Sequence, residues 1–242
     1  MKKIILIFLL SSFIVYSCDK SKADAPKGSS PVMKKDSAQS SIQRNQELSK
    51  TGKQVSDFVS NGHEIQYETE GDLNQDGLSD KVLVLRKKDD SLAQRTMIVL
   101  LKNPDKTYRL FKTSKKVLPA EYNDSGYKMH DPEDVSIEKG TLYINLYDIG
   151  PYGNQFSQFK YMNDNSLVLT YIETYNMGAG SHSSFVYEPI KGKIRLETVN
   201  TMEEEMPATV ETFQIKKERF LFENISPENI VTNTYNSVEN NK

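Results

Sequence analysis

Oxygen-bearing side chains recur at alternate positions in the nine residues from Asp72 to Asp80. Carboxylate or amide groups fill the first, third, fifth and ninth positions (Asp72, Asn74, Asp76 and Asp80). Alternate side chains of a tight loop can converge on one centre, and Gly77 at the sixth position permits the positive φ of a sharp turn. The carbonyl of Leu78 can supply a further oxygen. This set suits Ca²⁺, which takes about six to eight hard oxygen ligands, better than Mg²⁺, which demands a stricter octahedron.

The loop differs from an EF-hand, because its twelfth position is Leu83 and its flanks are typical of strands. Residues 71–85 instead resemble the strand-loop-strand calcium loop of FG-GAP and VCBS-type repeats. That resemblance implies the ligands Asp72, Asn74, Asp76, the Leu78 carbonyl and Asp80. Only one copy occurs, so we expect a structural Ca²⁺ that stabilises one hairpin. The alternative is an acidic surface turn that binds no metal.

The N-terminus has the pattern of a secretory signal. Two lysines precede an apolar segment at residues 4–15, and Cys18, the only cysteine, follows Ser17. The apolar segment is shorter than the roughly 20 residues that span a bilayer. Residues 15–18 resemble the lipobox of bacterial lipoproteins, with Cys18 as the lipid acceptor. The alternative is a cytoplasmic protein with an apolar N-terminus and a buried cysteine.

The lipobox resemblance implies that acyl chains on Cys18 hold the chain in membrane lipid of a bacterial cell envelope. We expect the outer membrane in preference to the inner one, with the domain facing the periplasm or the cell surface. Because Cys18 is the sole cysteine, no intramolecular disulfide can form.

Charge is distributed unevenly along the 242 residues. The whole chain carries −2, of which residues 1–17 contribute +2 and residues 18–53 contribute +4, leaving −8 on residues 54–242. An acidic domain argues against a nucleic-acid partner. We divide the chain into a signal peptide (1–17), a lipid anchor and disordered tether (18–53) and a β domain (54–242).

Alternating hydrophobicity and turn residues predict an all-β domain built as an antiparallel meander of about ten strands, either a β-sandwich or partly propeller-like. A short helix is expected at 53–60, begun by Thr51 and ended by Asn61-Gly62. Strands are expected at 81–87, 96–101, 141–147, 156–161, 166–174, 184–188, 193–198, 209–215 and 219–222. The first two of these are apolar on both faces, as central strands are.

No combination of residues indicates catalysis, and we assign no catalytic residue. The chain has three histidines, and a serine beside a histidine in sequence is not a nucleophile–base pair, because neighbours in an extended chain point apart. Residues 176–183 form the candidate binding loop, through Gly178, Gly180, Ser181 and His182, although the glycines can simply make a hairpin loop.

These features predict a membrane-anchored cell-envelope lipoprotein whose calcium-stabilised β domain is a binding or interaction module. Its partner would be an envelope protein, a glycan or peptidoglycan. The arrangement of helix, calcium loop and aromatic hairpins resembles uncharacterised lipoproteins of Bacteroidetes-type bacteria. The alternatives are an envelope hydrolase that uses paired acidic residues and a purely structural lipoprotein.

Overall fold

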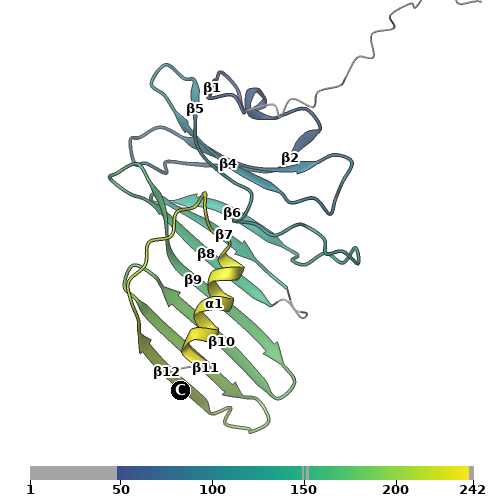
Figure 1. The fold of residues 1–242 in the computed structure, drawn as a ribbon, viewed down its shortest axis with the longest axis vertical. Coiled ribbons are helices and arrows are strands. Elements are labelled where there is room, and N and C mark those ends of the chain that lie inside the picture. The colour runs from purple at the N-terminus through teal and green to yellow at the C-terminus, as the bar shows by residue number, and fades with distance from the viewer. Residues whose placement is uncertain (1–47, 149, 151–152, 240–242) are drawn as a thin grey trace, which may run out of the picture. The chain divides into compact units, whose positions relative to one another are not determined.

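A computed structural model describes residues 48–148, 150 and 153–239. These described residues all belong to one compact unit. The predicted signal peptide, Cys18 and the tether as far as residue 47 lie outside the described residues. In the described part, twelve strands form two antiparallel sheets, accompanied by one α-helix and one short 3-10 helix (Figure 1).

The smaller sheet has five strands in the order β1-β5-β4-β3-β2. Their bounds are β1 Thr51–Gly52, β2 His63–Gly71, β3 Asp80–Lys87, β4 Thr96–Lys102 and β5 Tyr108–Ser114. The apolar runs of β3 and β4 are buried on both faces, as expected. Val82 and Val84 face the main core, whereas Leu83 and Leu85 pack against Phe58 in a second cluster.

The larger sheet has seven strands in the order β12-β11-β10-β9-β8-β7-β6, so each strand pairs with its neighbour in sequence. Their bounds are β6 Glu133–Glu138, β7 Thr141–Leu146, β8 Asn154–Tyr161, β9 Leu167–Gly178, β10 Ser181–Glu188, β11 Lys193–Asn200 and β12 Ala208–Gln214. Helix α1, Pro227–Glu239, lies across one face of this sheet (Figure 1).

Helix α1 packs on the sheet through residues four apart. Ile230, Thr234 and Val238 are buried, which is the spacing of one helix face. Ser226 precedes the helix, and its Oγ accepts a hydrogen bond from the backbone N–H of Asn229 at 3.3 Å. Pro227 follows at the first helical position, where its missing N–H costs nothing. The helix is therefore amphipathic. One face packs against the core, and its other faces lie at the protein surface.

The main core lies between the two sheets and under α1. It combines residues of β3 and β4, such as Val84 and Val99, with residues of the larger sheet, such as Leu142 and Phe159. The ring of Phe159 meets that of Phe222 edge-on, with centroids 5.3 Å apart. Two layers of sheet with apolar inner faces are the arrangement of a β-sandwich.

The predicted all-β, antiparallel fold is confirmed, and its details differ in three places. The expected N-terminal helix is a single 3-10 turn, Val55–Phe58, and Thr51 lies in β1 instead of capping it. Residues 219–222 make only an isolated bridge, Leu221 to Val168, instead of a strand. The prediction did not include helix α1, β1, β5 or β6, and it gave β2 only as a strand without bounds that flanks the loop at 72–80.

Candidate functional site

The loop between β2 and β3 brings three of the five predicted metal ligands together. The carboxylate of Asp72 accepts hydrogen bonds from the backbone N–H groups of Asp76 at 3.0 Å and Gly77 at 2.9 Å. The Asn74 amide donates to Asp76 Oδ2 at 2.8 Å. Gly77 has φ +85°, as its position predicts, and Gln75 also takes a positive φ of 61°. The oxygens of Asp72, Asn74 and Asp76 are therefore held in one small loop.

Asp80, the fourth predicted side-chain ligand, is fully buried at the start of β3. Its Oδ2 accepts hydrogen bonds from the backbone N–H of Leu73 at 3.0 Å and of Asn74 at 3.3 Å, and its Oδ1 from that of Lys102 at 2.9 Å. Burial raises the pKa of this carboxyl group, and the three backbone hydrogen bonds oppose the rise. Asp80 thus connects the loop, β3 and the end of β4.

The donor chemistry of the loop fits Ca²⁺. A carboxylate offers about four lone-pair sites, so Asp80 can hold three N–H donors and still contribute to a cation. Three carboxylates, one amide oxygen and the Leu78 carbonyl are hard oxygen ligands of the kind calcium prefers. Within the described residues, however, no three His, Cys, Asp or Glu side chains converge as a ready-made metal site.

The predicted binding loop at 176–183 is a tight hairpin. Gly178 pairs with Ser181 across a two-residue turn, and Gly180 there has φ +91°. His182 lies on β10, and its Nδ1 is hydrogen-bonded to the hydroxyl of Tyr175 at 3.0 Å. Its neighbours Ser181 and Ser183 point to the opposite face of the sheet, because side chains alternate along a strand.

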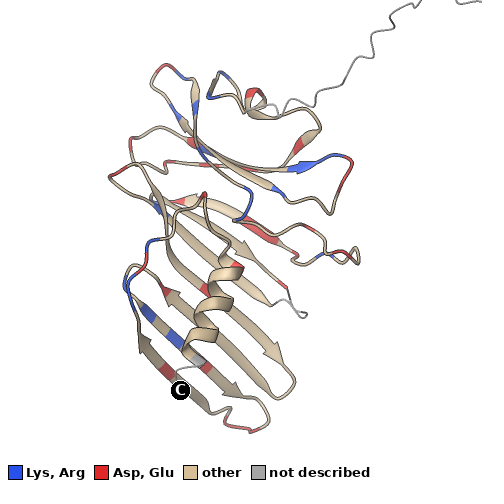
Figure 2. Cartoon of the chain, in the orientation of Figure 1, with Lys and Arg blue, Asp and Glu red and all other residues tan. Residues whose placement is uncertain are grey.

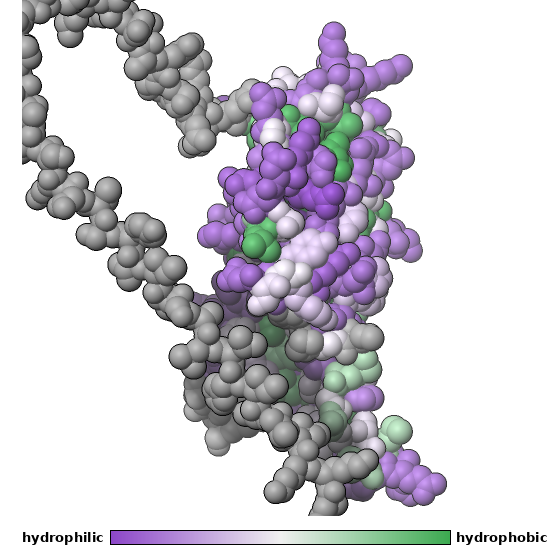
Figure 3. Space-filling view, turned by 90° about the vertical axis from the view of Figure 1, so that its right-hand side faces the viewer, coloured by the Kyte–Doolittle hydropathy of each residue, from purple (hydrophilic) through white to green (hydrophobic). Residues whose placement is uncertain are grey.

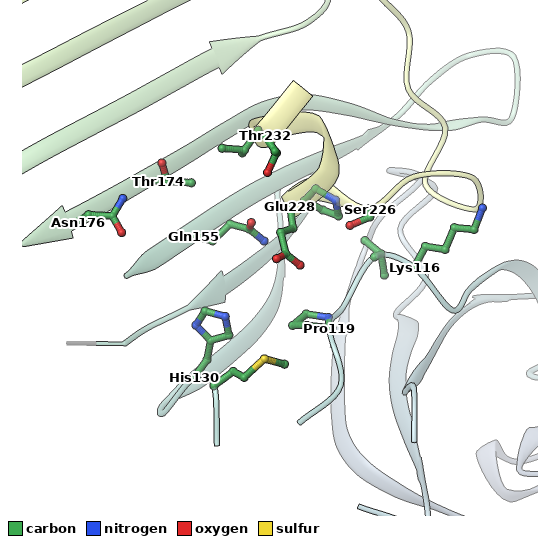
Figure 4. A pocket seen from close by; sticks show the side chains of 13 residues that line it. Lys116, Pro119, His130, Gln155, Thr174, Asn176, Ser226, Glu228 and Thr232 are labelled. Atoms are coloured by element: carbon green, nitrogen blue, oxygen red, sulfur yellow. The ribbon is translucent and has the colours of Figure 1, made fainter. Parts of the chain in front are cut away.

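Sequence reasoning missed a groove that runs beside α1 on the larger sheet, here called the α1 groove. It consists of two adjoining pockets of about 200 Å³ and about 400 Å³, both lined by Thr174, Asn176, Val231 and Thr232. The larger pocket has a volume typical of small-ligand sites. Its wall is the side of α1 that carries Val231, Thr232, Tyr235 and Asn236. The smaller pocket extends toward His130, Gln155 and Glu228 (Figure 4).

The strand register explains the chemistry of the groove floor. One cross-strand row, Ile172, Tyr187 and Ile194, is fully buried in the core. The next row on the same face lies two residues closer to the turn between β9 and β10. This row is mixed and consists of Thr174, Phe185, Leu196 and Glu211. Two residues farther again, the row is neutral, polar and exposed, with Asn176, Ser183, Thr198 and Thr209. This last row is called the polar row below.

The aromatic ring of Tyr235 stands on the wall of the groove. It meets the ring of Phe185 edge-on at a centroid distance of 6.2 Å, and 43% of the tyrosine remains exposed. Contact with a buried phenylalanine restricts the ring while leaving part of it accessible. Such a ring can pack against a bound molecule at small entropic cost.

A buried ion pair lies close to the smaller pocket. The guanidinium of Arg95 forms a bidentate contact with the carboxylate of Glu133, with N–O distances of 2.5 Å and 2.8 Å. Both side chains are almost fully buried.

Two titratable side chains near this ion pair have shifted pKa values. Burial and the adjacent Glu133 raise the pKa of Tyr67 to about 12. Burial lowers the pKa of His130, against the opposing influence of Glu133 and Asp148. His130 therefore lines the pocket as a predominantly neutral ring at neutral pH.

Charges of both signs are spread over the described strands and loops (Figure 2). The side seen in Figure 3 is mostly polar, with small hydrophobic areas. Among the residues that line the larger pocket there are two glutamates, Glu197 and Glu211, and no lysine or arginine. The larger pocket of the α1 groove thus has no cationic residue among its described lining residues, whereas Lys116 and Glu228 both line the smaller pocket.

The fold and site define a two-sheet antiparallel β protein with a surface groove beside helix α1. Comparison of the chain with protein-family models, curated proteins and solved structures gives no match. Among the described helices, none has the length and apolar character needed to cross a membrane.

Proposed function

We propose that this chain is a lipid-anchored protein of the bacterial cell envelope whose β domain is a non-catalytic binding module, with its ligand in the α1 groove. The observation that carries the proposal is the polar row beside α1. Four exposed hydrogen-bonding side chains from four strands line one side of a pocket whose opposite wall holds a partly exposed tyrosine. A concave site with a few converging polar groups is the usual form of a ligand site.

The buried carboxylates support a binding role over the alternative of an envelope hydrolase. Paired-acid catalysis needs two available carboxyl groups about 5–10 Å apart, flanking the substrate bond. Asp80 is held by three backbone N–H groups, Glu121 by Arg86 and Glu133 by Arg95. Each of these buried acids already has a structural partner, so each is poorly placed to serve as an acid or a nucleophile.

We propose a structural Ca²⁺ at Asp72, Asn74, Asp76, the Leu78 carbonyl and Asp80. The loop also contacts the larger sheet, because Gln75 Nε2 donates a hydrogen bond to the Lys139 carbonyl at 3.0 Å and Leu73 is fully buried in the main core. An ion that orders this loop would therefore stabilise the contact between the sheets, and with it the sheet that carries the groove.

The envelope location is proposed from Cys18 and the lipobox-like residues before it. Acyl chains on Cys18 would tie the chain to the membrane, and the residues up to 47 would separate the anchor from the folded unit. A binding module held in this way meets partners at the membrane surface. Envelope glycan, peptidoglycan and envelope proteins are all within its reach.

Site-specific photo-crosslinking tests the position of the binding site. A diazirine amino acid replaces Asn236 on the groove wall of the full chain, and in a matched variant it replaces Thr212. Thr212 is exposed on β12 and pairs with Arg195, so it lies on the opposite face of the sheet. After irradiation of intact cells, we expect an adduct at position 236 and not at position 212. Equal labelling of both positions, or none at 236, would contradict the proposal.

A further inference from the structure

We infer that the ligand of the α1 groove is an uncharged saccharide chain. This inference rests on the proposed function, because it names the chemistry of the ligand in the same groove. Three features of the groove point to this ligand: the side chains of the polar row, the charge of the larger pocket and Tyr235 on its wall.

The polar row offers hydrogen bonds through side chains alone. Ser183, Thr198 and Thr209 make no side-chain hydrogen bond to another described residue, so their hydroxyl groups are available to solvent and to a ligand. Each hydroxyl can donate one hydrogen bond and accept two, and Asn176 adds an amide that does both. A polyhydroxylated molecule has the same mixed donor and acceptor character. Neighbouring strands lie about 4.8 Å apart, so the row extends for roughly 14 Å, enough for a short oligosaccharide.

The backbone around the groove floor argues against an extended peptide. Peptides commonly bind sheets by adding a strand to an unpaired edge, where backbone groups are free. The polar row lies on the face of the sheet, and the backbone of β9, β10 and β11 is already paired on both sides. A ligand on this face meets side chains only, as a saccharide does in a hydroxyl-lined groove.

The charge of the larger pocket selects against anions. None of the described residues that line this pocket is a lysine or an arginine. Glu211 belongs to the floor of the groove, whereas the carboxylate of Glu197 is paired with Arg195 at 2.8 Å on the opposite face of the sheet. A carboxylate in the floor repels phosphate, sulfate and uronate groups. Tyr235 supplies the apolar surface on which the C–H face of a sugar ring can pack, because the Phe185 contact holds its ring at the wall. Neutral hydroxyl groups, a positioned aromatic ring and the absence of cations from this pocket together specify an uncharged sugar.

Chemical analysis of the photo-adduct at position 236 tests this inference. The adduct is isolated from the full chain after exhaustive proteolysis, and the attached material is hydrolysed and identified by mass spectrometry. We expect neutral hexoses or N-acetylated amino sugars. A peptide, a fatty acyl group or an anionic sugar would overturn the saccharide inference and leave the binding site at the groove. Absence of any adduct would contradict the proposed function and this inference together.

Two substitutions of Tyr235 on the groove wall distinguish the loss of ring packing against the ligand from a loss of folded structure. Tyr235→Ala should lower the adduct yield by about tenfold, in line with the loss of one aromatic contact. Tyr235→Phe keeps the ring and should keep most of the yield. Circular dichroism and thermal unfolding confirm that both variants fold. Equal yields from folded Tyr235→Ala and wild-type chains would contradict the role of the tyrosine and the inference that uses it.

Discussion

Gln75 donates a hydrogen bond from its Nε2 to the carbonyl oxygen of Lys139 at 3.0 Å, and so joins the proposed calcium loop to the turn between β6 and β7. The two residues are 64 positions apart in the chain, and Gln75 lies in a loop between strands of the smaller sheet whereas Lys139 lies in a loop between strands of the larger sheet. Gly140 beside this contact has φ +76°, and a Cβ there would lie 2.2 Å from Gln75 Nε2. The contact between the loop and the larger sheet therefore requires a glycine at position 140.

Gly140→Ala should destabilise the domain more than Gly126→Ala does. Both glycines have nearly the same positive φ, +76° and +75°, so both substitutions carry a similar backbone cost of about 1–2 kcal/mol. Only the alanine at 140 displaces Gln75, because the space around Gly126 is open. We expect an additional loss of about 1 kcal/mol from the broken hydrogen bond, measured by urea unfolding. Equal losses from the two variants would show that the Gln75 contact contributes nothing to stability.

Calcium should raise the melting temperature of the full chain, and Asp76→Ala should remove this effect. At a free concentration near 100 times the dissociation constant, binding to the folded state stabilises it by about 2.7 kcal/mol. That free energy corresponds to a shift of several degrees for a domain of this size. Differential scanning fluorimetry with added Ca²⁺ or with a chelator measures the difference.

Asp124→Ala is the matched control for the calcium measurement. Asp124 also lies in a turn that contains an asparagine, Asn123, but its turn lacks the alternate spacing of oxygen ligands. The Asp124→Ala chain should keep the full calcium-dependent shift. A wild-type melting curve that is the same with calcium and with chelator would rule out the metal site.

Stability should fall as the pH drops below about 6.5, and His130 should account for part of the fall. Burial lowers the pKa of His130 in the folded state below its ordinary value of 6.5, so the unfolded chain binds more protons between the two pKa values. Stability therefore rises with pH through that window and is lost as the pH falls. His130→Gln should flatten the slope of unfolding free energy against pH between about pH 5 and 7. An unchanged slope would contradict the burial of a neutral imidazole.

Cys18→Ala should release the protein from the membrane fraction as a folded, soluble chain. The substitution removes the lipid acceptor, and the residues that follow carry only scattered basic charge that salt can screen. Fractionation of cells, followed by a high-salt wash of the membranes, measures the release. A Cys18→Ala chain that stays in the washed membrane pellet would disprove the lipid anchor.

Much of the fold could be predicted because its signals are local. The apolar runs of β3 and β4 predict strands buried on both faces, and the spacing from Asp72 to Asp80 predicts a loop between strands. The signals of β2 are weaker, because Glu64, Glu68 and Glu70 break its apolar pattern. Helix α1 is rich in Asn and Thr, which are poor helix formers. Ser226-Pro227-Glu228 before residues 230, 234 and 238 was the signal that could have located it.

The groove could not be predicted, because it depends on register between strands. Asn176, Ser183, Thr198 and Thr209 are ordinary polar residues in four separate segments. Only the pairing of β9, β10, β11 and β12 places them in one row, and only α1 gives that row a wall. The predicted loop at 176–183 did reach two members of the polar row, Asn176 and Ser183, although the residues singled out there lie at the hairpin tip.

The most direct test of the binding site is to fill the groove with a bulky side chain and to measure how much photo-adduct still forms at its wall. Thr198→Tyr places a ring on the exposed floor, and Thr212→Tyr places the same ring on the opposite face of the neighbouring strand. The readout is the yield of photo-adduct at position 236 in intact cells, with the amount of folded protein measured in parallel. We predict that Thr198→Tyr abolishes the adduct and that Thr212→Tyr leaves it unchanged. An undiminished adduct in the Thr198→Tyr chain would show that the ligand does not occupy the α1 groove.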